Sequence, residues 1–549
     1  MSKFEYPSWF KKCMVSHEEA MAVTIKSGTK IASGFATNEP HQFYDTLWDH
    51  IQENDLHDLN ICQALFMAPH RICLGDTMQS KGMFNGASSK KGSGVFSKVA
   101  RKANAVTKKL EGLSKLISHY KELKERKIVM TSPFIGAVTN MIIPPTAITS
   151  ALYPEYVGRN TTRMGITDMQ SIHFPDALYA MGYDADDNPK ADVWVQVMTT
   201  PNENGEMSYG PANGANGEVT DKILEQCDVK MILYVNPNYP FTRGYNDAKN
   251  THDIEEFKAL AEKGFLWVVE DDSKIPALPA NSFDNPGKTE LAIAENVVNH
   301  IELNKHYTYG KAIQVGFGGT GVLAIRALKE SSWVGRNYTE MLEPFTMDLF
   351  EAGKIKGSHF IEKNGTRTEL DGKMVCTFTL AEENSDFYKK IDNNPDIVIS
   401  TASRVVIPEG FYYGLGINNC LSIDFQGHVN SGGRFHNHHS GVGGGATIHR
   451  GLGRGGVGYL CLKSTYKGFD GRDHSAIMPF MPGSPISHIG PDLMGGREKA
   501  RFFVVTEFGV TQVSGKSQSE FVKSLISIAH PKFKDSLAKE AYKEFRIVV

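Results

Sequence analysis

The chain has 549 residues, of which 41% are apolar and 22% are charged, and its formal net charge at pH 7 is −3. These values are typical of a globular protein of roughly two to four domains, and they exclude a disordered or fibrous chain. The nearly balanced charge also excludes a protein whose overall field holds nucleic acid or an anionic membrane.

Three features bear on the cellular compartment. The amino-terminal sequence MSKFEYPSWFKK lacks the basic and then apolar pattern of a signal peptide. The seven cysteines are an odd number without C-x-x-C spacing, which favours reduced thiols. The uncharged stretch 129–154 contains a Pro-Pro pair, so it predicts a buried loop and strand rather than a membrane span. We therefore expect a cytoplasmic protein without a membrane partner.

Apolar segments of strand length alternate with amphipathic segments of helix length. Residues 230–235, 265–270 and 397–400 have the composition of buried strands. Such alternation is typical of α/β layers. The sequence therefore predicts an α/β fold with two large domains.

A weak internal repeat supports two related halves. GTKIASGF at 28–35 and GKAIQVGF at 310–317 both read as a turn, a short strand, a glycine turn and then a helix. The passage 276–288 is rich in Pro, Asn and Gly, a composition that punctuates structure. We place the boundary there, which gives domains at 1–283 and 284–549.

Residues 81–127 are rich in Lys and Arg and begin with a Gly/Ser-rich run. From Val95 to Lys127 the apolar residues have helical spacing. A basic amphipathic helix can bind a membrane surface or a partner. The interpretation that we favour is a solvated lid or insertion helix.

The sharpest motif is a predicted strand followed by G-x-G-x-x-G at Gly316, Gly318 and Gly321, which opens an apolar helix. Such a loop can hold a phosphate, carboxylate or carbonyl group. Glu340 lies at about the distance at which a dinucleotide-binding fold places its ribose-binding acid, so a nicotinamide or flavin enzyme is the rival interpretation. The polar residues 335–339 suit the buried strand of that fold poorly.

The second motif is a dense glycine run at 440–458. It favours backbone amides near a substrate, as in an oxyanion hole or phosphate cradle, although a wide loop with several positive φ angles is the alternative. His436, His438 and His439 lie just upstream. No Cys or acid completes a zinc set, so we expect histidines at the rim of a site and no metal.

Two further enzyme classes are excluded by spacing. The segment 509–517 resembles a phosphate-binding P-loop, but five residues separate its glycine from Gly-Lys where the P-loop has four. The chain also has no G-x-S-x-G elbow, so a serine thioesterase of the α/β-hydrolase kind is disfavoured.

Several motifs in the same order resemble the acetyl-CoA hydrolase/transferase family, close to 4-hydroxybutyrate and succinyl-CoA:acetate CoA-transferases. They are HEEA at 17–20, SGTKI at 27–31, VQVMTTPNENGEMSYG at 195–210, DFQGHVN at 424–430, VVTEFG at 504–509, GKS at 515–517 and IAHP at 528–531. The resemblance implies two related CoA-transferase-type (NagB/RpiA-like) α/β domains with mostly parallel sheets and an active site in the cleft between them. It also implies a homodimer.

The resemblance further implies the residues of the site. Tyr338-Thr-Glu340 occupies the place of the family's nucleophile motif, ahead of a helix that ends in glycine, so Glu340 is the expected catalytic residue. Where many members carry Asp-Phe after the glycines, this chain has Thr447-Ile448, which leaves the acyl group open. The implied CoA-binding residues are Gly316, Phe317, Gly318, Gly319, Thr320, Gly443, Gly444 and Lys467, with Asn430 near the substrate or oxyanion.

The expected activity is transfer of CoA between a short-chain acyl-CoA and a carboxylic acid such as acetate, through a glutamyl-CoA thioester and with ping-pong kinetics. Water in place of the acid would give an acyl-CoA hydrolase that uses the same glutamate. Neither reaction requires a metal or a redox cofactor, and CoA is a substrate. The alternatives left open are an NAD-dependent oxidoreductase and a non-catalytic CoA-binding regulator.

Overall fold

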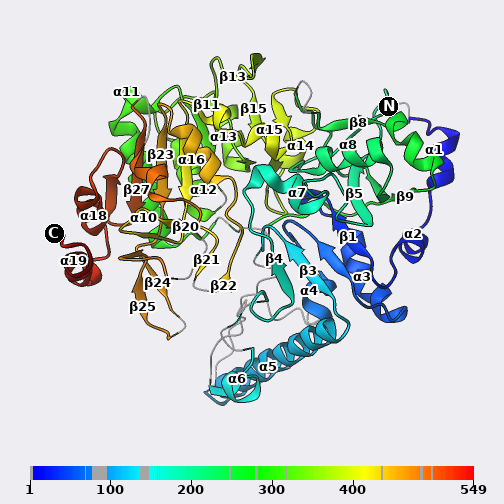
Figure 1. The fold of residues 1–549 in the computed structure, drawn as a ribbon, viewed down its shortest axis with the longest axis horizontal. Helices are drawn as coiled ribbons and strands as arrows, with labels where there is room; N and C mark the ends of the chain where they lie inside the picture. The colour runs from blue at the N-terminus through cyan, green and yellow to red at the C-terminus, as the bar shows by residue number, and fades with distance from the viewer. Residues whose placement is uncertain are drawn as a thin grey trace.

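The computed structural model describes residues 4–68, 70–76, 95–136, 147–156, 159, 161–245, 249–278, 282, 284–316, 318–434, 437–468, 470–482, 486–495 and 499–549. Two sheets stand side by side in Figure 1, one built from the first half of the chain, drawn from blue to green, and the other from the second half, drawn from green to red. The two chain ends lie at opposite sides of this view.

The first sheet has seven strands in the order β4-β3-β2-β1-β5-β7-β9, and every neighbouring pair is parallel. All residues of β5 are buried, which is typical of a parallel strand covered on both faces. The predicted strands at 230–235 and 265–270 are confirmed as β7 and β9. The bounds are β1 Lys30–Ser33, β2 Asn60–Cys62, β3 Val129–Ser132, β4 Thr167–Met169, β5 Val193–Thr199, β7 Lys230–Asn236 and β9 Leu266–Glu270.

Nine described helices belong to this half. The longest, α5, lies below the sheet in Figure 1 and connects β2 to β3. The bounds are α1 Ser8–Cys13, α2 His17–Thr24, α3 His41–Glu53, α4 Arg71–Leu74, α5 Val95–Glu125, α6 Ala147–Leu152, α7 Ala177–Met181, α8 Asn216–Gln226 and α9 Lys258–Glu262.

The structure corrects the interpretation of the basic segment. Its helix is confirmed, but Leu116, Ile117, Tyr120 and Leu123 are buried in the core of the first half. Their spacing places them on one face of α5. This part of the predicted insertion is therefore the crossover helix between two parallel strands, and not a solvated lid.

The second sheet has the order β11-β10-β18-β23-β27-β28, in which only β28 runs antiparallel to its neighbour. The two sheets span residues 30–270 and 312–512, and the domain boundary within 276–288 stays a prediction. The bounds are β10 Ala312–Val315, β11 Arg336–Asn337, β18 Leu415–Asn419, β23 Val457–Cys461, β27 Arg501–Thr506 and β28 Gly509–Gln512.

The second half also has ten described helices and several two- and three-stranded ladders. The predicted strand at 397–400 is confirmed as β17, in one of these ladders. The helices are α10 Lys288–Leu303, α11 Lys305–Thr308, α12 Gly319–Leu328, α13 Pro344–Glu351, α14 Phe387–Ile391, α15 Ala402–Val405, α16 Gly445–Leu452, α17 Gly490–Met494, α18 Gln518–Ser527 and α19 Pro531–Phe545. The small ladders, with β6 and β8 from the first half, are β6 Glu206–Ser208 with β8 Thr251–Asp253, β12 Met341–Leu342 with β16 Phe378–Thr379, β13 Phe360–Lys363 with β14 Thr366–Glu369, β15 Met374–Cys376 with β17 Ile397–Ile399, β19 Ser422–Asp424 with β20 Val429–Asn430 and β26 Ile477–Met478, β21 Gly433–Arg434 with β22 Asn437–His438, and β24 Thr465–Lys467 with β25 Asp473–Ser475.

The internal repeat corresponds to equivalent strands of the two sheets. Gly28 and Gly310 both have positive φ, at 86° and 72°, and each precedes a first central strand, β1 or β10. Each strand ends at a glycine, Gly34 or Gly316, on which a Cβ would overlap with an asparagine oxygen. Each strand also lies where the strand order reverses, between β2 and β5 or between β11 and β18. In α/β sheets, ligands bind outside the carboxyl ends of the strands at such points.

One hydrophobic cluster joins the two halves. Phe35 and Phe174 from the first half pack with Phe378 from the second, and the ring centroids of Phe35 and Phe378 are 5.2 Å apart. Burial of each such ring contributes on the order of 2 kcal/mol. All seven cysteines are free thiols, as the sequence predicts. Within the described ranges, no helix is both long and apolar enough to span a membrane.

Candidate active site

Glu340 lies at the carboxyl edge of the second sheet, directly after the strand β11 and before β12. The Thr339 hydroxyl accepts a hydrogen bond from the Val315 N–H at 3.1 Å and lies 3.3 Å from the Val315 carbonyl oxygen. These contacts fix Glu340 beside the loop that follows β10. The residue is 9% exposed, so its carboxylate is almost fully withdrawn from water.

The glycine run brings backbone amides to this carboxylate. The Gly444 N–H donates to Oε2 of Glu340 at 2.9 Å. A Cβ at Gly444 would overlap with that oxygen and with Val406, so the close approach requires glycine. Gly443 has a φ of 64°, in the left-handed region that favours glycine. The glycine run therefore contacts Glu340, while the binding of CoA by Gly443 and Gly444 stays a prediction.

Burial changes the acidity of Glu340. Loss of hydration raises its pKa to about 7, against the opposing effect of the Gly444 N–H. Glu343 is also buried, and burial raises its pKa to about 7 as well. However, the Glu343 carboxylate caps α13 and accepts from the N–H groups of Phe345 and Thr346 at 2.6 and 3.1 Å. Glu343 thus has a structural role, and Glu340 alone of the two contacts the glycine loop.

The G-x-G-x-x-G loop lies at the reversal point of the second sheet. Gly316 donates its N–H to the Ile417 carbonyl and packs on Asn418, while Gly318, with a φ of 137°, packs on Asn419. Gly319 is the first residue of α12, and a Cβ there would meet no atom of another described part of the chain within 4 Å.

Two other predicted CoA contacts belong to this segment of the sequence. Thr320 is 9% exposed in the first turn of α12. Phe317 lies outside the described residues. The loop therefore leaves an open position at Gly319, beside the N-terminus of a ten-residue helix that can receive an anion or a carbonyl.

Asn430 is fully buried, and its side chain organises its own loop. Its Oδ1 accepts from the N–H groups of Gly432 and Gly433, both at 3.1 Å, and its Nδ2 donates to the Gly433 carbonyl. These hydrogen bonds do not reach Glu340. The role of Asn430 at the substrate stays a prediction.

Lys467 lies on the exposed hairpin of β24 and β25. Its ammonium group pairs with Asp473 at 2.7 Å, and its side chain is 71% exposed. It contacts neither Glu340 nor the glycine loops in this structure. Its role in binding CoA likewise stays a prediction.

The two described histidines of the predicted run lie in and directly after β22. His438 lies in β22, and the His439 N–H donates to the Gly432 carbonyl at 2.7 Å. His436 lies outside the described residues. β21 and β22 lie between the two halves in Figure 1, so these residues border the region where the halves meet.

Sequence analysis missed a buried histidine pair beneath the glycine loop. His449 on α16 and His488 share a hydrogen bond at 2.7 Å, and burial lowers the pKa of both, that of His488 to about 4. A Cβ at Gly445 would lie 3.2 Å from the His488 ring, so the neutral pair packs against the start of α16. The I-H-R sequence inside the glycine run was the available signal for His449, and none existed for His488.

The first half also contacts the glycine loop. The Phe174 N–H donates to the Gly443 carbonyl at 3.2 Å, and the Thr37 hydroxyl donates to the Thr379 carbonyl at 3.0 Å. The edge that bears Glu340 therefore meets the first half of the chain. The architecture is therefore two α/β halves, each with a mostly parallel sheet, that meet beside a buried glutamate and a glycine loop.

The comparisons with known proteins agree with this architecture. Residues 384–541 match the acetyl-CoA hydrolase/transferase C-terminal domain. The chain is 30% identical over 404 residues to a succinyl-CoA:cyclohexane-1-carboxylate CoA transferase of Geobacter metallireducens, over 72% of this chain and 81% of that protein. It is 27% identical over 367 residues to a butyryl-CoA:acetate CoA-transferase of Anaerostipes caccae, over 64% and 72% of the two chains.

A solved structure agrees at the level of the fold. The structure of a 4-hydroxybutyrate CoA-transferase from Porphyromonas gingivalis superposes with a TM-score of 0.58 at 21% identity, over 98% of this chain and 99% of that one. The predicted fold class, mixed α/β with mostly parallel sheets, is confirmed. The chain belongs to the acetyl-CoA hydrolase/transferase family.

Proposed function

We propose that the protein is a CoA-transferase that moves CoA between a short-chain acyl-CoA and a carboxylic acid, with Glu340 as the nucleophile. The observation that carries this proposal is the buried Glu340 carboxylate against the Gly444 N–H. The names of the relatives, which are CoA-transferases for butyryl-CoA with acetate and for succinyl-CoA with a cyclic acid, support the substrate class. We also propose a homodimer in the cytoplasm.

The chemistry begins on the carboxylate. One Glu340 oxygen attacks the thioester carbon, the C–S bond breaks, and CoA leaves as a thiolate from a mixed anhydride. The thiolate then attacks the glutamyl carbon of the anhydride. The donor acid leaves as a carboxylate, and a glutamyl-CoA thioester remains. The acceptor carboxylate attacks that thioester, and the same steps run in reverse to give the new acyl-CoA.

The chain's own groups fit these steps. With a pKa of about 7, Glu340 is substantially ionised at neutral pH, and its poor hydration favours nucleophilic attack. Each tetrahedral intermediate carries an oxyanion, and the Gly444 N–H is in place as a donor for it. The open position at Gly319 allows a cofactor-sized substrate to approach the backbone of α12.

Trapping of the intermediate tests the proposal. The protein is incubated with acetyl-CoA, reduced with borohydride and digested, and mass spectrometry locates the modified residue. We expect a CoA-dependent change at Glu340 that is absent from Glu340→Gln and retained in the matched variant Glu343→Gln. An unmodified Glu340, or equal modification of both wild type and Glu340→Gln, would refute the nucleophile.

Hydrolysis is the second candidate because water can attack the same thioester. The product distinguishes the two activities. With acetyl-CoA and butyrate, a transferase forms butyryl-CoA without free thiol, whereas a hydrolase releases free CoA whether or not butyrate is present. NAD binding without binding of CoA would support an oxidoreductase instead.

A further inference from the structure

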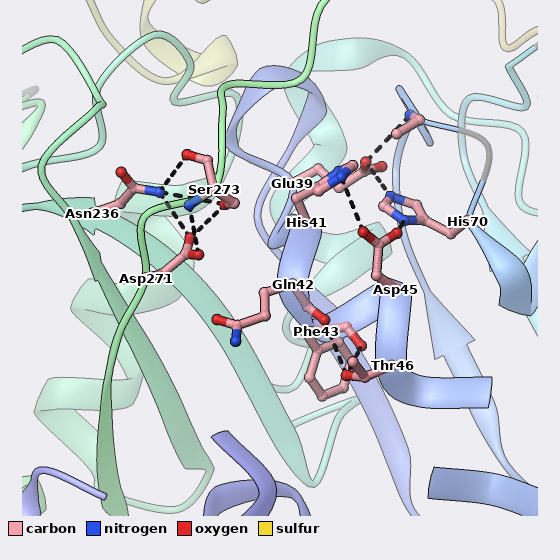
Figure 2. A network of polar contacts seen from close by, with 11 residues as sticks. Glu39, His41, Gln42, Phe43, Asp45, Thr46, His70, Asn236, Asp271 and Ser273 are labelled. Carbon is pink, nitrogen blue, oxygen red and sulfur yellow. Dashed lines mark hydrogen bonds and ion pairs between the residues drawn. The ribbon is translucent and has the colours of Figure 1, made fainter. Parts of the chain in front are cut away.

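A second polar cluster lies at the carboxyl edge of the first sheet. Figure 2 shows Glu39, His41, Asp45 and His70 pointing toward one another. Glu39 follows the loop after β1, His41 and Asp45 lie one turn apart at the start of α3, and His70 comes from the segment that follows β2. This edge is the counterpart of the one that carries Glu340, because β1 and β10 occupy equivalent reversal points.

The side chains of the cluster are already close enough to share one ion. Nε2 of His70 lies 2.5 Å from Oε1 of Glu39, and Nδ1 of His70 lies 2.8 Å from Oδ1 of Asp45. Nε2 of His41 lies 3.1 Å from Oδ2 of Asp45. One ligand atom each from Glu39, His41 and His70 lie within 4.8 Å of one another. Bonds of about 2.0–2.2 Å to a zinc ion need only small movements from this arrangement.

Burial and charge both favour a cation here. The side chains of Glu39 and His70 are 0% exposed, and those of His41 and Asp45 are 33% and 49% exposed. Two carboxylates, those of Glu39 and Asp45, therefore lie beside the two imidazoles in a largely enclosed place. A divalent ion would balance the two carboxylate charges.

Backbone N–H groups hold the Glu39 carboxylate in position. The Met67 N–H donates to Oε2 of Glu39 at 2.9 Å, and the Ala68 N–H donates to Oε1 at 3.3 Å. Such hydrogen bonds orient a ligand carboxylate. Nδ1 of His41 is a buried nitrogen without a hydrogen-bond partner among the described residues. This nitrogen is therefore an unsatisfied polar group of the cluster.

We propose that Glu39, His41 and His70 bind a zinc-type divalent ion. Two imidazoles and one carboxylate are a donor set that Zn²⁺ accepts, with a water molecule in the fourth position. Asp45, whose Oδ1 lies 2.8 Å from Nδ1 of His70, orients that imidazole through its other nitrogen. The ion fixes the segment after β2, including Met67 and His70, to the first turn of α3. It takes no part in the acyl chemistry at Glu340, and so the site does not depend on the proposed function.

Metal titration of the whole chain tests the site. The purified protein is stripped with a chelator, dialysed and titrated with Zn²⁺ against a colorimetric competitor at about pH 8, because metal binding to imidazole and carboxylate ligands competes with protons. We expect one equivalent of tightly bound metal. With Co²⁺ as the probe, we expect the visible absorption bands of a four-coordinate nitrogen and oxygen site.

Matched variants separate this cluster from other binding. His41→Ala removes one ligand but leaves the buried Glu39–His70 pair intact, so the fold is retained and circular dichroism confirms it. Loss of a hydrogen-bond partner behind a ligand typically lowers metal affinity by roughly tenfold to hundredfold. Since His41→Ala removes a ligand itself, we expect its affinity for Zn²⁺ to fall by more than that and its Co²⁺ absorption bands to disappear. His57→Ala, which removes an exposed histidine paired with Asp55, is the control and should bind like wild type.

Two results would overturn the proposal. If wild type takes up no stoichiometric metal, the cluster is a buried ion pair held by a proton. If His41→Ala binds metal as tightly as wild type, the metal lies elsewhere. Trapping of the glutamyl adduct on the stripped protein reports on Glu340 separately, so failure of one proposal does not decide the other.

Discussion

Glu340 and Gly444, 104 positions apart in the chain, are joined by a hydrogen bond of 2.9 Å between a carboxylate oxygen and a backbone N–H. The same N–H lowers the pKa of the carboxyl group, but burial raises that pKa by a larger amount, to about 7. In the function that we propose, the contact therefore places the nucleophile and an oxyanion donor at one point before any substrate arrives. Electrostatic preorganisation of this kind is among the largest contributions to catalysis.

Gly444→Ala should sharply lower turnover. The new Cβ would overlap with Oε2 of Glu340 and with Val406, so the loop must withdraw its N–H from the carboxylate. Loss of one oxyanion donor typically lowers kcat by about 10²–10³. Steady-state kinetics with acetyl-CoA and a carboxylate measure the effect, with thermal unfolding as the check on folding. An unchanged kcat would remove Gly444 from the proposed site.

Gly319→Ala should change KM rather than kcat. A Cβ at Gly319 meets no atom within 4 Å and the residue is helical, so stability should be unchanged or slightly higher. If CoA approaches this backbone, the methyl group will raise KM for the acyl-CoA and leave kcat nearly constant. The acceptor acid should keep its KM, and it serves as the internal control. Equal KM values for wild type and variant would place CoA elsewhere.

Glu340→Gln should abolish transfer and stabilise the protein at high pH. The folded pKa of about 7 lies above the value of 4.5 for a free glutamate, so the folded state binds more protons between these values. The free-energy cost of burying the ionised carboxylate is absent below about pH 4.5, grows as the pH rises to about 7 and is constant above that pH. We expect the variant to gain up to about 3 kcal/mol at pH 8 and nothing at pH 4.

Glu343→Gln is the matched control for that measurement. Its carboxylate accepts two backbone N–H groups at the start of α13, so the amide loses charge-assisted hydrogen bonds and helix capping. Burial also raises the pKa of Glu343 to about 7, so the amide avoids a similar cost of ionisation at high pH. We therefore expect a smaller gain in stability at pH 8 than for Glu340→Gln, with transfer retained. Denaturant unfolding at several pH values measures both variants. A Glu340→Gln variant that is less stable than wild type at pH 8 would contradict the buried carboxylate as a source of instability.

The pH profile of kcat/KM should rise through an apparent pKa near 7. In the proposed mechanism only the ionised Glu340 attacks, and burial raises its pKa to about 7 in the free protein. The activity therefore falls as the pH drops below this value. Glu343→Gln should leave the limb in place, since Glu343 makes no contact with substrate in the proposed mechanism. A limb near pH 4.5 would mean that Glu340 is well hydrated during turnover.

Asn430→Asp distinguishes a loop residue from an oxyanion donor. The aspartate retains the Oδ1 acceptor for Gly432 and Gly433 but loses the Nδ2 donor. If Asn430 only shapes the loop, kcat should fall by less than about tenfold. If it donates to an oxyanion, the negative charge should lower kcat by about a hundredfold or more. Thermal unfolding at the same pH checks that the loop remains folded.

The sequence predicted the layers of this fold better than its contacts. Runs such as 231–235 and 266–269 are apolar throughout, a composition typical of parallel strands that are covered on both faces. The glycines at 316 and 444 were found because close backbone approach leaves glycine as a visible trace. Glu340 was found through the family motif, since one acid among many carries no signal of its own burial.

Contacts over long sequence distances could not be predicted. Glu39 and His70 meet because β1 and β2 are adjacent, and their pairing follows from strand order rather than from a local pattern. The basic segment read as an insertion because its charge is local, whereas the burial of Leu116 and Tyr120 depends on the sheet they cover. Asn430 had the right residue type for a donor, but its own loop uses those hydrogen bonds.

The hydrogen bond from the Phe174 N–H to the Gly443 carbonyl has a consequence for protein engineering. A chimera that joins the first half of this chain to the second half of a relative would be cut within the predicted boundary 276–288. The contact that such a chimera must preserve lies far from this cut in the sequence, at Phe174 and Gly443. The first half of the hybrid must place a backbone N–H within hydrogen-bonding distance of the Gly443 carbonyl. Libraries of such hybrids should therefore be sorted by their match at the segment around Phe174, and hybrids with insertions there should fold but turn over poorly.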